Sequence, residues 1–431
     1  MNPDLLARRF LVWNFLRAVL HQGWWLVTSL YMVVDAGLSP ADLLMIAAAQ
    51  GVASFVFEIP AGVVADTIGR KPAIAVSHLL MAAAMITTGL APGFVPLLVA
   101  QMLWGISWTF ASGSDIAWAT DEIDQPDRIH LLLAAQGRWQ MIGAGIGILA
   151  FGALATFTGR PTAIVTAGAL MLALGTWFTL RFPERRFTRV RTRHLHAALD
   201  IARRGARLAV RDRTLLVLVA VTILVNGAAD AFGRLYPVAL ADLGLPAGPV
   251  GTAWFTAIAL AGYVLAALAL TIVQRGLHTD RGARVGLISA CLTGAFGLTL
   301  TGLAPDLELA VAAVIITSGI AMPLTRTITT IWVNRRTTSD IRATTHSFFA
   351  QSEYVGEILC AATLAALAAT SNTIVITAAL FAVATATIAL HRPNRHLCCP
   401  CRAANTTGGT STDPTPDPDM PRTDAEHPDA L

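Results

Sequence analysis

Ionisable side chains stand inside long apolar stretches of this sequence, where they are able to bind protons or a charged solute. Glu353 and Glu357 are four residues apart and would share one face of a helix. Two carboxylates held close together in a medium of low dielectric constant repel each other, so we expect one of them to hold a proton near neutral pH. Asp230 and Arg234 have the same spacing. We expect this pair to stay ionised, and an ion pair that merely lowers the cost of burial explains it equally well.

Other polar residues in apolar stretches extend this set. His21 and Asp115 join Glu353, Glu357 and Asp230 as candidates for proton coupling. A histidine held by a hydrogen bond in the protein core is, however, more common than a proton relay. The candidates for lining a substrate cavity are Arg17, Gln22, Trp108, Arg138, Asn226, Arg234 and Arg326. Because each charge costs about 2.5–3.5 kcal/mol at the centre of a bilayer, so many of them favour a water-filled central path.

The elements that must position these residues are membrane-spanning helices. The chain has 431 residues, of which 55% are apolar and only 13% charged, a balance that a water-soluble fold does not show. About 20 apolar residues cross a bilayer as a helix. Twelve windows meet this length, and they predict an all-α integral membrane protein with twelve transmembrane helices. The windows are 9–33, 41–62, 73–91, 95–118, 130–157, 161–182, 214–239, 249–273, 284–304, 308–333, 344–369 and 372–390.

Lysine and arginine collect in alternate connections, which predicts the orientation. The connections after windows 2, 6, 8 and 10 and both termini are basic, whereas the others hold only Arg160. Basic loops are retained in the cytoplasm during insertion. We therefore expect a multi-pass protein of the plasma (inner) membrane, embedded in the lipid bilayer with both termini in the cytoplasm. Because topology already requires these basic segments, they do not indicate nucleic-acid binding.

The longest basic run divides the chain into two halves. We predict an N-terminal six-helix half at 1–182, a basic cytoplasmic linker at 183–213, a C-terminal six-helix half at 214–391 and a disordered tail at 392–431. The linker is either an amphipathic helix on anionic headgroups or a plain solvated segment. His391, His396, Cys398, Cys399 and Cys401 cluster near the tail, but their spacing fits no firm zinc pattern. We expect no metal site and no cofactor.

One short stretch carries a family resemblance. Residues 57–71 read FEIPAGVVADTIGRK, and the second half repeats the Gly-x3-Asp spacing in the connection after window 8, at Gly276 and Asp280. Gly62, Asp66, Gly69, Arg70 and Lys71 match the signature loop between helices two and three of the major facilitator superfamily. The twelve-span plan is similar to that fold, with two pseudo-symmetric six-helix halves around a central cavity.

The resemblance also implies a mechanical role for this loop. In related transporters the loop aspartate faces the start of helix 11 and the loop arginine pairs with an acid that ends helix 4. These positions correspond here to Asp66 near Ala343, and to Arg70 with Asp121 or Glu122. The resemblance therefore implies that these charges form a conformational latch at the cytoplasmic ends of the helices.

Three stretches, 57–62, 110–122 and 334–347, together resemble bacterial efflux pumps of the macrolide and tetracycline type, which are proton-driven drug antiporters. Two features depart from the family pattern. Gln101 stands four residues before Gly105, where many proton-coupled members have an arginine, so coupling through that arginine is excluded. The fifth window has glycines but lacks the proline of the antiporter motif, and close helix packing explains those glycines.

The resemblance implies a secondary active transporter that exports an amphipathic drug or antibiotic-like compound in exchange for protons, by alternating access. The alternative is proton-coupled transport of a polar or anionic metabolite held by Arg17 and Arg326. The sequence has no nucleotide, metal or nucleophile motif, so an enzyme is not expected. We expect a monomer whose partners are a small-molecule substrate, protons and the lipid bilayer.

Overall fold

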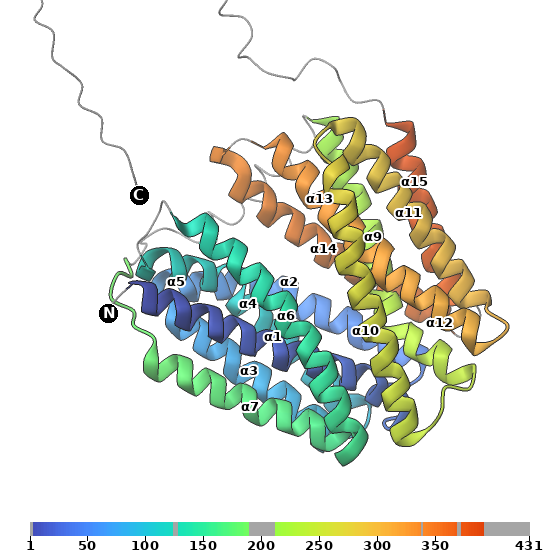
Figure 1. Cartoon of the computed structure of the whole chain (residues 1–431), viewed down its shortest axis with the longest axis horizontal. Coiled ribbons are helices and arrows are strands. Elements are labelled where there is room, and N and C mark those ends of the chain that lie inside the picture. The colour runs from blue at the N-terminus through green and yellow to red at the C-terminus, as the bar shows by residue number, and fades with distance from the viewer. Residues whose placement is uncertain (1–2, 124–127, 189–211, 338, 369–371, 392–431) are drawn as a thin grey trace, which may run out of the picture. The chain divides into compact units, whose positions relative to one another are not determined.

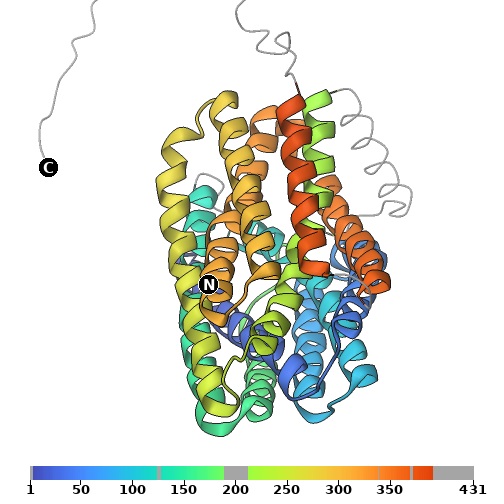
Figure 2. The same cartoon turned by 90° about the vertical axis from the view of Figure 1, so that its right-hand side faces the viewer.

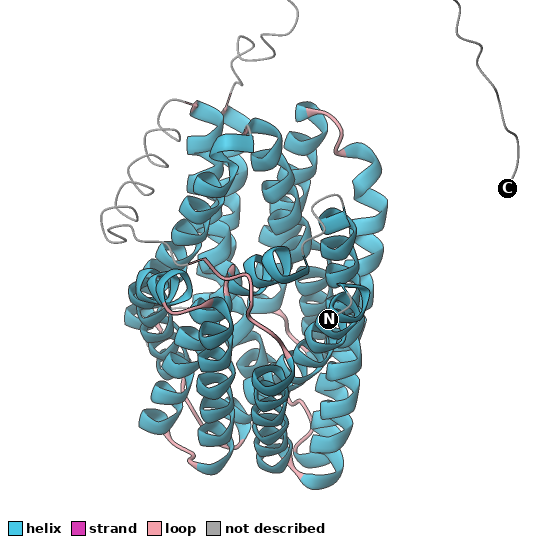
Figure 3. Ribbon diagram, turned by 90° about the vertical axis from the view of Figure 1, so that its left-hand side faces the viewer, coloured by secondary structure: helices cyan, strands magenta, loops and turns pink. Residues whose placement is uncertain are grey.

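The chain folds into helices throughout the part that the computed structural model describes, residues 3–123, 128–188, 212–337, 339–368 and 372–391, without a strand in these ranges (Figure 3). This confirms the predicted all-α, twelve-span fold. Most of the predicted linker, at 189–211, and the predicted tail with His396 and its three cysteines lie outside the described residues.

Seven helices form the six spans of the N-terminal half, because the fourth span is broken. Its two parts meet at Ser112 and Gly113, and Gly113 adopts a left-handed φ of 73° that ends the first part. The helices are α1 (Pro3–Val34), α2 (Pro40–Thr67), α3 (Arg70–Leu90), α4 (Phe94–Ala111), α5 (Ser114–Ile123), α6 (Ile129–Thr158) and α7 (Arg160–Arg181).

The C-terminal half repeats the plan with a different interruption. Its fourth span contains a π-helical turn, η3 (Thr317–Ala321), between α12 (Leu307–Ile316) and α13 (Met322–Arg336). The other elements are α9 (Arg213–Asp242), α10 (Gly248–Val273), the short 3₁₀ turn η2 (Gln274–Gly276), α11 (Asp280–Leu303), α14 (Ser339–Leu367) and α15 (Thr373–Leu390).

Ten of the described spans are long and apolar enough to cross a membrane by composition alone. The two long helices outside this group are α1, with 32 residues, and α14, with 29. They hold Arg17 and His21, and Glu353 and Glu357, respectively. The two least apolar spans therefore carry many of the candidate functional residues.

Each half has its own apolar core. In the N-terminal half α1 packs on α6 and α3 on α7, around the buried rings of Trp13, Trp118 and Phe178. In the C-terminal half α9 packs on α14 and α11 on α15, around Trp332 and Phe381. Figures 1 and 2 show the two groups of helices side by side.

The halves meet mainly through α2 with α14 and α6 with α10. At one end of the bundle, here called the Asp35 end, Arg160 pairs with Asp35 at 2.5 Å and donates across to the Thr252 hydroxyl at 2.7 Å. Nearer the middle, the Tyr263 hydroxyl donates to the Met141 carbonyl at 2.6 Å. From this end the helices of the two halves diverge (Figure 1) toward the opposite end, here called the Arg70 end.

Glycines set the closest approaches of these helices. A Cβ at Gly147 would stand 2.2 Å from the Val19 carbonyl oxygen, so α6 lies directly against α1. A Cβ at Gly152 would stand 2.3 Å from the Thr256 hydroxyl of α10, across the two halves. Close packing thus accounts for these two glycines of the fifth span without an antiporter motif.

Candidate functional site

The acids of α14 lie where that helix crosses α9. A Cβ at Gly356 would stand 2.2 Å from the Ile223 carbonyl oxygen, and one at Gly227 would stand 2.4 Å from the Gly356 carbonyl oxygen. This close crossing brings Glu357 of α14 into electrostatic range of Asp230 and Arg234 of α9, as well as of Glu353. Three carboxylates and two arginines, Arg234 and Arg326, therefore gather in the C-terminal half.

Arg234 connects this acid group to the other half of the molecule. Its side chain is 2% exposed, lies 3.4 Å from the Asp230 carboxylate and donates to the Gln50 amide oxygen of α2 at 2.6 Å. Its guanidinium carbon is 5.6 Å from the centroid of the Trp25 ring. The geometry combines the intrahelical ion pair with a hydrogen bond across the two halves. A change of charge at Asp230 or Glu357 therefore alters the electrostatic environment of Arg234, which forms the hydrogen bond to Gln50 between the halves.

The C-terminal half holds a cavity of about 210 Å³ on the Arg70 side of these acids. Arg326 and Glu353 line it and approach to 3.4 Å, with His346 and Thr330 also in the wall. The Arg326 side chain is 72% exposed and that of Glu353 is 28% exposed. Arg326 is thus only loosely engaged and can also contact a solute.

The N-terminal half holds a cavity of about 380 Å³ around Arg17, here called the Arg17 cavity. Arg17 is 9% exposed and stands between the rings of Trp13 and Trp108, at 5.6 and 5.5 Å from their centroids. Its nearest acid is Asp115, at 3.7 Å. The arginine charge is therefore balanced by one carboxylate and two aromatic faces. His21, Gln22 and Ser112 also line this cavity.

Amide side chains form the remaining polar wall of the Arg17 cavity. The Asn14 amide oxygen accepts from both Gln136 and Gln140 at 3.1 Å, and the Asn14 amide nitrogen donates to the Phe10 carbonyl at 3.0 Å. Sequence reasoning did not place Asn14 or Gln136 at the site. The spacing of Gln136 and Gln140, one turn apart on an apolar helix, was the available signal.

His21 is held in a packing arrangement. Its Nε2 accepts from the Trp104 indole at 3.2 Å, and its ring stacks on that indole with 5.7 Å between centroids. An acceptor nitrogen must be unprotonated, so this arrangement favours the neutral ring. His78 has the same arrangement, accepting from the Trp13 indole at 3.1 Å. The geometry supports the packing alternative for His21 over the proton relay.

Two other candidates, Arg138 and Asn226, are not among the described residues that line the Arg17 cavity. Arg138 is exposed on α6. Asn226 donates to the Thr222 carbonyl of its own helix at 3.1 Å. Gln101, which stands in the place of the family's arginine, is fully buried on α4, and its amide has no hydrogen-bond partner among the described residues.

The predicted latch residues lie at the Arg70 end. Arg70 forms an ion pair with Asp121 of α5 and donates to the Ala117 carbonyl at 2.9 Å. The Lys71 backbone N–H donates at 2.8 Å to Glu184, a residue that sequence reasoning missed. At Gly69, with φ of 144°, a Cβ would stand 2.7 Å from the same Glu184 carboxylate. Glycine is thus required there by the backbone and by Glu184 together.

The other acid considered for the latch has a separate role. Glu122 accepts from the backbone N–H groups of Arg185 and Arg186 at 2.6 and 2.7 Å. Asp66 is half-buried on α2, and Gly62 has open space where a Cβ would stand. The side chain of Ala343, the predicted neighbour of Asp66, lies outside the described residues.

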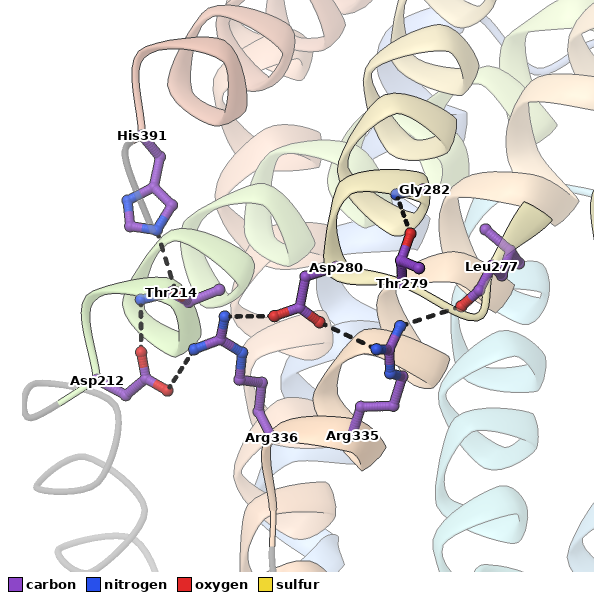
Figure 4. A network of polar contacts seen from close by, with 9 residues as sticks. All are labelled: Asp212, Thr214, Leu277, Thr279, Asp280, Gly282, Arg335, Arg336 and His391. Carbon is purple, nitrogen blue, oxygen red and sulfur yellow. Dashed lines mark hydrogen bonds and ion pairs between the residues drawn. The ribbon is translucent and has the colours of Figure 1, made fainter. Parts of the chain in front are cut away.

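The C-terminal half has a corresponding charged group, shown in Figure 4. Asp280, in the repeated Gly-x3-Asp element, pairs with Arg336 of α13 at 2.7 Å and with Arg335 at 3.4 Å. Arg336 also lies 3.7 Å from Asp212, the residue that caps α9. His391, which follows α15, hydrogen-bonds to the Thr214 hydroxyl at 3.1 Å. This group joins α9, α11, α13 and the end of α15.

Twelve helical spans in two halves, ten of them apolar enough to cross a membrane, with a polar cavity in each half, define a multi-pass helical membrane protein of the solute-transporter class. Residues 14–361 match the Major Facilitator Superfamily, and the chain belongs to this family of transporters. A comparison with curated proteins finds no match.

Solved structures share the fold at low sequence identity. The nucleoside transporter NupG aligns with a TM-score of 0.71 at 15% identity over 90% of this chain and 98% of its own. A POT family transporter in complex with 5-aminolevulinic acid aligns with a TM-score of 0.69 at 13% identity, over 89% of this chain and 94% of its own. A D-xylose-proton symporter aligns with a TM-score of 0.65 at 12% identity, over 88% of this chain and 96% of its own. These similarities support the fold.

Proposed function

We propose that this protein is a proton-coupled secondary transporter that exports an amphipathic, drug-like or antibiotic-like compound by alternating access. The observation that carries the proposal is the position of the acid group: Asp230 lies 3.4 Å from Arg234, and Glu357 is within electrostatic range of the same arginine. Arg234 in turn donates across the two halves to Gln50. Protonation of one acid changes the charge opposite Arg234. That change alters a contact which must rearrange when the halves rock.

The Arg17 cavity is suited to a substrate with both apolar and polar parts. Trp108 supplies an aromatic wall that is 45% exposed, while Gln22, Gln136 and Gln140 supply amide donors and acceptors. The charge of Arg17 is already balanced by Asp115. A neutral or weakly basic compound therefore enters without leaving an unpaired buried charge.

A polar or anionic metabolite is the second candidate, and Arg326 favours it. That side chain is largely exposed and sits only 3.4 Å from a single carboxylate, so it can turn toward an anion. The similar structures include a nucleoside transporter and a D-xylose-proton symporter, whose substrates are polar solutes. The direction of transport rests on the resemblance to the macrolide and tetracycline pumps.

Because basic loops are retained in the cytoplasm, we infer that the Arg70 end faces the cytoplasm of a plasma-membrane protein. The halves then hold together at the outer end, through Arg160, Asp35 and Thr252, and both cavities lie on the inner side. This is the conformation in which an exporter receives its compound. Asp66, Arg70 and Asp121 then act as a latch on the cytoplasmic surface.

Purified protein in proteoliposomes tests the coupling. A panel of amphipathic compounds, nucleosides and sugars is added while internal pH is followed with a trapped dye. We expect an amphipathic compound to move protons, and E357Q and E353Q to abolish that flux while the protein remains folded. E308Q, an exposed glutamate at the Asp35 end, is the matched control. Unchanged flux in both acid variants would contradict the role of the acids, and a response to sugars alone would favour the second candidate.

A further inference from the structure

Glu58 is a carboxylate on α2, outside the acid group of α9 and α14. It lies in the N-terminal half, within an otherwise apolar stretch, and its Oε2 atom is buried without a hydrogen-bond partner among the described residues. A buried carboxylate with an unsatisfied oxygen is costly while it is ionised. Protonation removes the negative charge and so lowers this cost.

The neighbour of Glu58 belongs to the other half. The Tyr354 side chain of α14 lies within hydrogen-bonding range of the Glu58 carboxyl group. The two helices run in opposite directions and touch firmly one to two turns away, where a Cβ at Gly51 would stand 2.9 Å from the Ile358 side chain. Moving from Gly51 to Glu58 and from Ile358 to Tyr354 leads along both helices toward the Arg70 end.

Tyr354 also lies among the acids of α14. Its hydroxyl is in electrostatic range of Glu58, Glu353 and Glu357, with Arg326 as the nearby cation. Behind Glu357 stand Asp230 and Arg234 of α9. The hydroxyl, which both donates and accepts, therefore interacts with a carboxyl group of one half and with the acid pair of the other.

We propose that Glu58 is a second proton-binding residue, which exchanges its proton through the Tyr354 hydroxyl and holds it while α2 and α14 are in contact. When the helices separate, Glu58 loses Tyr354, meets water and releases the proton as a carboxylate. Proton binding by the N-terminal half would then depend on the contact between the halves. This inference deepens the proposed function, because it adds a proton site to the same coupled cycle.

Infrared difference spectroscopy of the protein in lipid nanodiscs, without any substrate, tests the assignment. A protonated carboxylic acid gives a carbonyl stretch that disappears on ionisation. We expect pH titration of the unmodified protein to remove at least two such components, and E58Q to lack one of them. Y354F should keep that component but shift it to higher frequency, since a hydrogen bond is lost. E308Q, with its exposed site, should leave the spectrum unchanged.

A spectrum of E58Q identical to that of the unmodified protein at every pH would overturn the proposal. So would a Y354F spectrum without a shift, which also serves if E58Q fails to fold. Because no substrate is present, these outcomes are separate from the proposed function. A third outcome is possible: E58Q lacks one carbonyl component, but E353Q and E357Q show normal proton-driven transport. That result would support the proton site at Glu58 and refute the coupling role of the α14 acids.

Discussion

The two halves carry equivalent charged groups at the Arg70 end, but with the signs exchanged. In the N-terminal half the loop supplies the cation, Arg70, and the fourth span supplies the acid, Asp121. In the C-terminal half the loop supplies the acid, Asp280, and the fourth span supplies the cations, Arg335 and Arg336. What the repeat retains is an ion pair between the second loop and the fourth span. Either sign order satisfies that requirement, so the sequence of the second copy was free to change.

The two groups differ in their additional support. Glu184, just after α7, binds the loop backbone in the N-terminal half, while Asp212, just before α9, binds Arg336 in the C-terminal half. Both residues lie near the ends of the predicted linker, 183–213. Each charged group is therefore connected to one end of this segment, and Arg336 has two acids where Arg70 has one.

Charge reversal at Arg70 should have the largest effect. R70D places two acids together and removes the donor to the Ala117 carbonyl, and each unsatisfied group costs about 1–3 kcal/mol. We expect transport-linked proton flux to fall by about tenfold or more. The swap R70D/D121R should restore most of the flux, since the pair is re-formed with the sign order of the other half. If R70D/D121R is no more active than either single variant, then the two sign orders are not equivalent and the comparison between the halves fails.

Neutralising Asp280 should have a smaller effect, because its arginines keep other partners. In D280N, Arg336 retains Asp212 and Arg335 retains the Leu277 carbonyl at 3.1 Å. We expect the free energy of unfolding in detergent to fall by about 1 kcal/mol. D280N/D212N should lose more than the sum of the single variants, since Arg336 then has neither acid. Strict additivity in chemical denaturation would show that the C-terminal group is not a connected unit.

His391 should give the smallest effect. Partial burial, together with the charge of Arg284, lowers the pKa of His391 below its ordinary value of about 6.5. The unfolded chain then binds this proton more readily than the folded one, so the stabilisation is present above pH 6.5 and is lost as pH falls through the folded-state pKa. Thermal unfolding of H391Q, compared with the unmodified protein between pH 5 and 8, should show a flatter pH dependence. Identical slopes would exclude a titrating His391.

The spans and the latch loop could be read from the sequence because both follow local rules. Apolar windows of the required length gave twelve helices, and the Gly-x3-Asp spacing located Asp280. The break at Gly113 and the π turn at Thr317–Ala321 lie within apolar windows that periodicity cannot divide. Hydropathy measures composition, whereas these interruptions depend on tertiary packing.

The partners of the site residues could not be predicted in the same way. Glu58 and Tyr354 are almost 300 positions apart in sequence and meet only because α2 packs on α14. Glu184 lies in an arginine-rich run, where a lone acid gives no signal of its loop contact. The sequence places Asp230 and Glu357 in two apolar windows but does not reveal that Gly227 and Gly356 bring their helices into contact.

If the acids of α14 control how the two halves rock, paired distance measurements show this most directly. With the native cysteines replaced, one spin-label pair at Leu131 and Ile272 reports the Arg70 end, and another at Phe157 and Val250 reports the Asp35 end; all four side chains are exposed on α6 and α10. Changing pH should move the two distances in opposite directions, and E357Q should hold them fixed. Distances that do not change with pH, or that change equally with pH in E357Q, would contradict this role of the α14 acids.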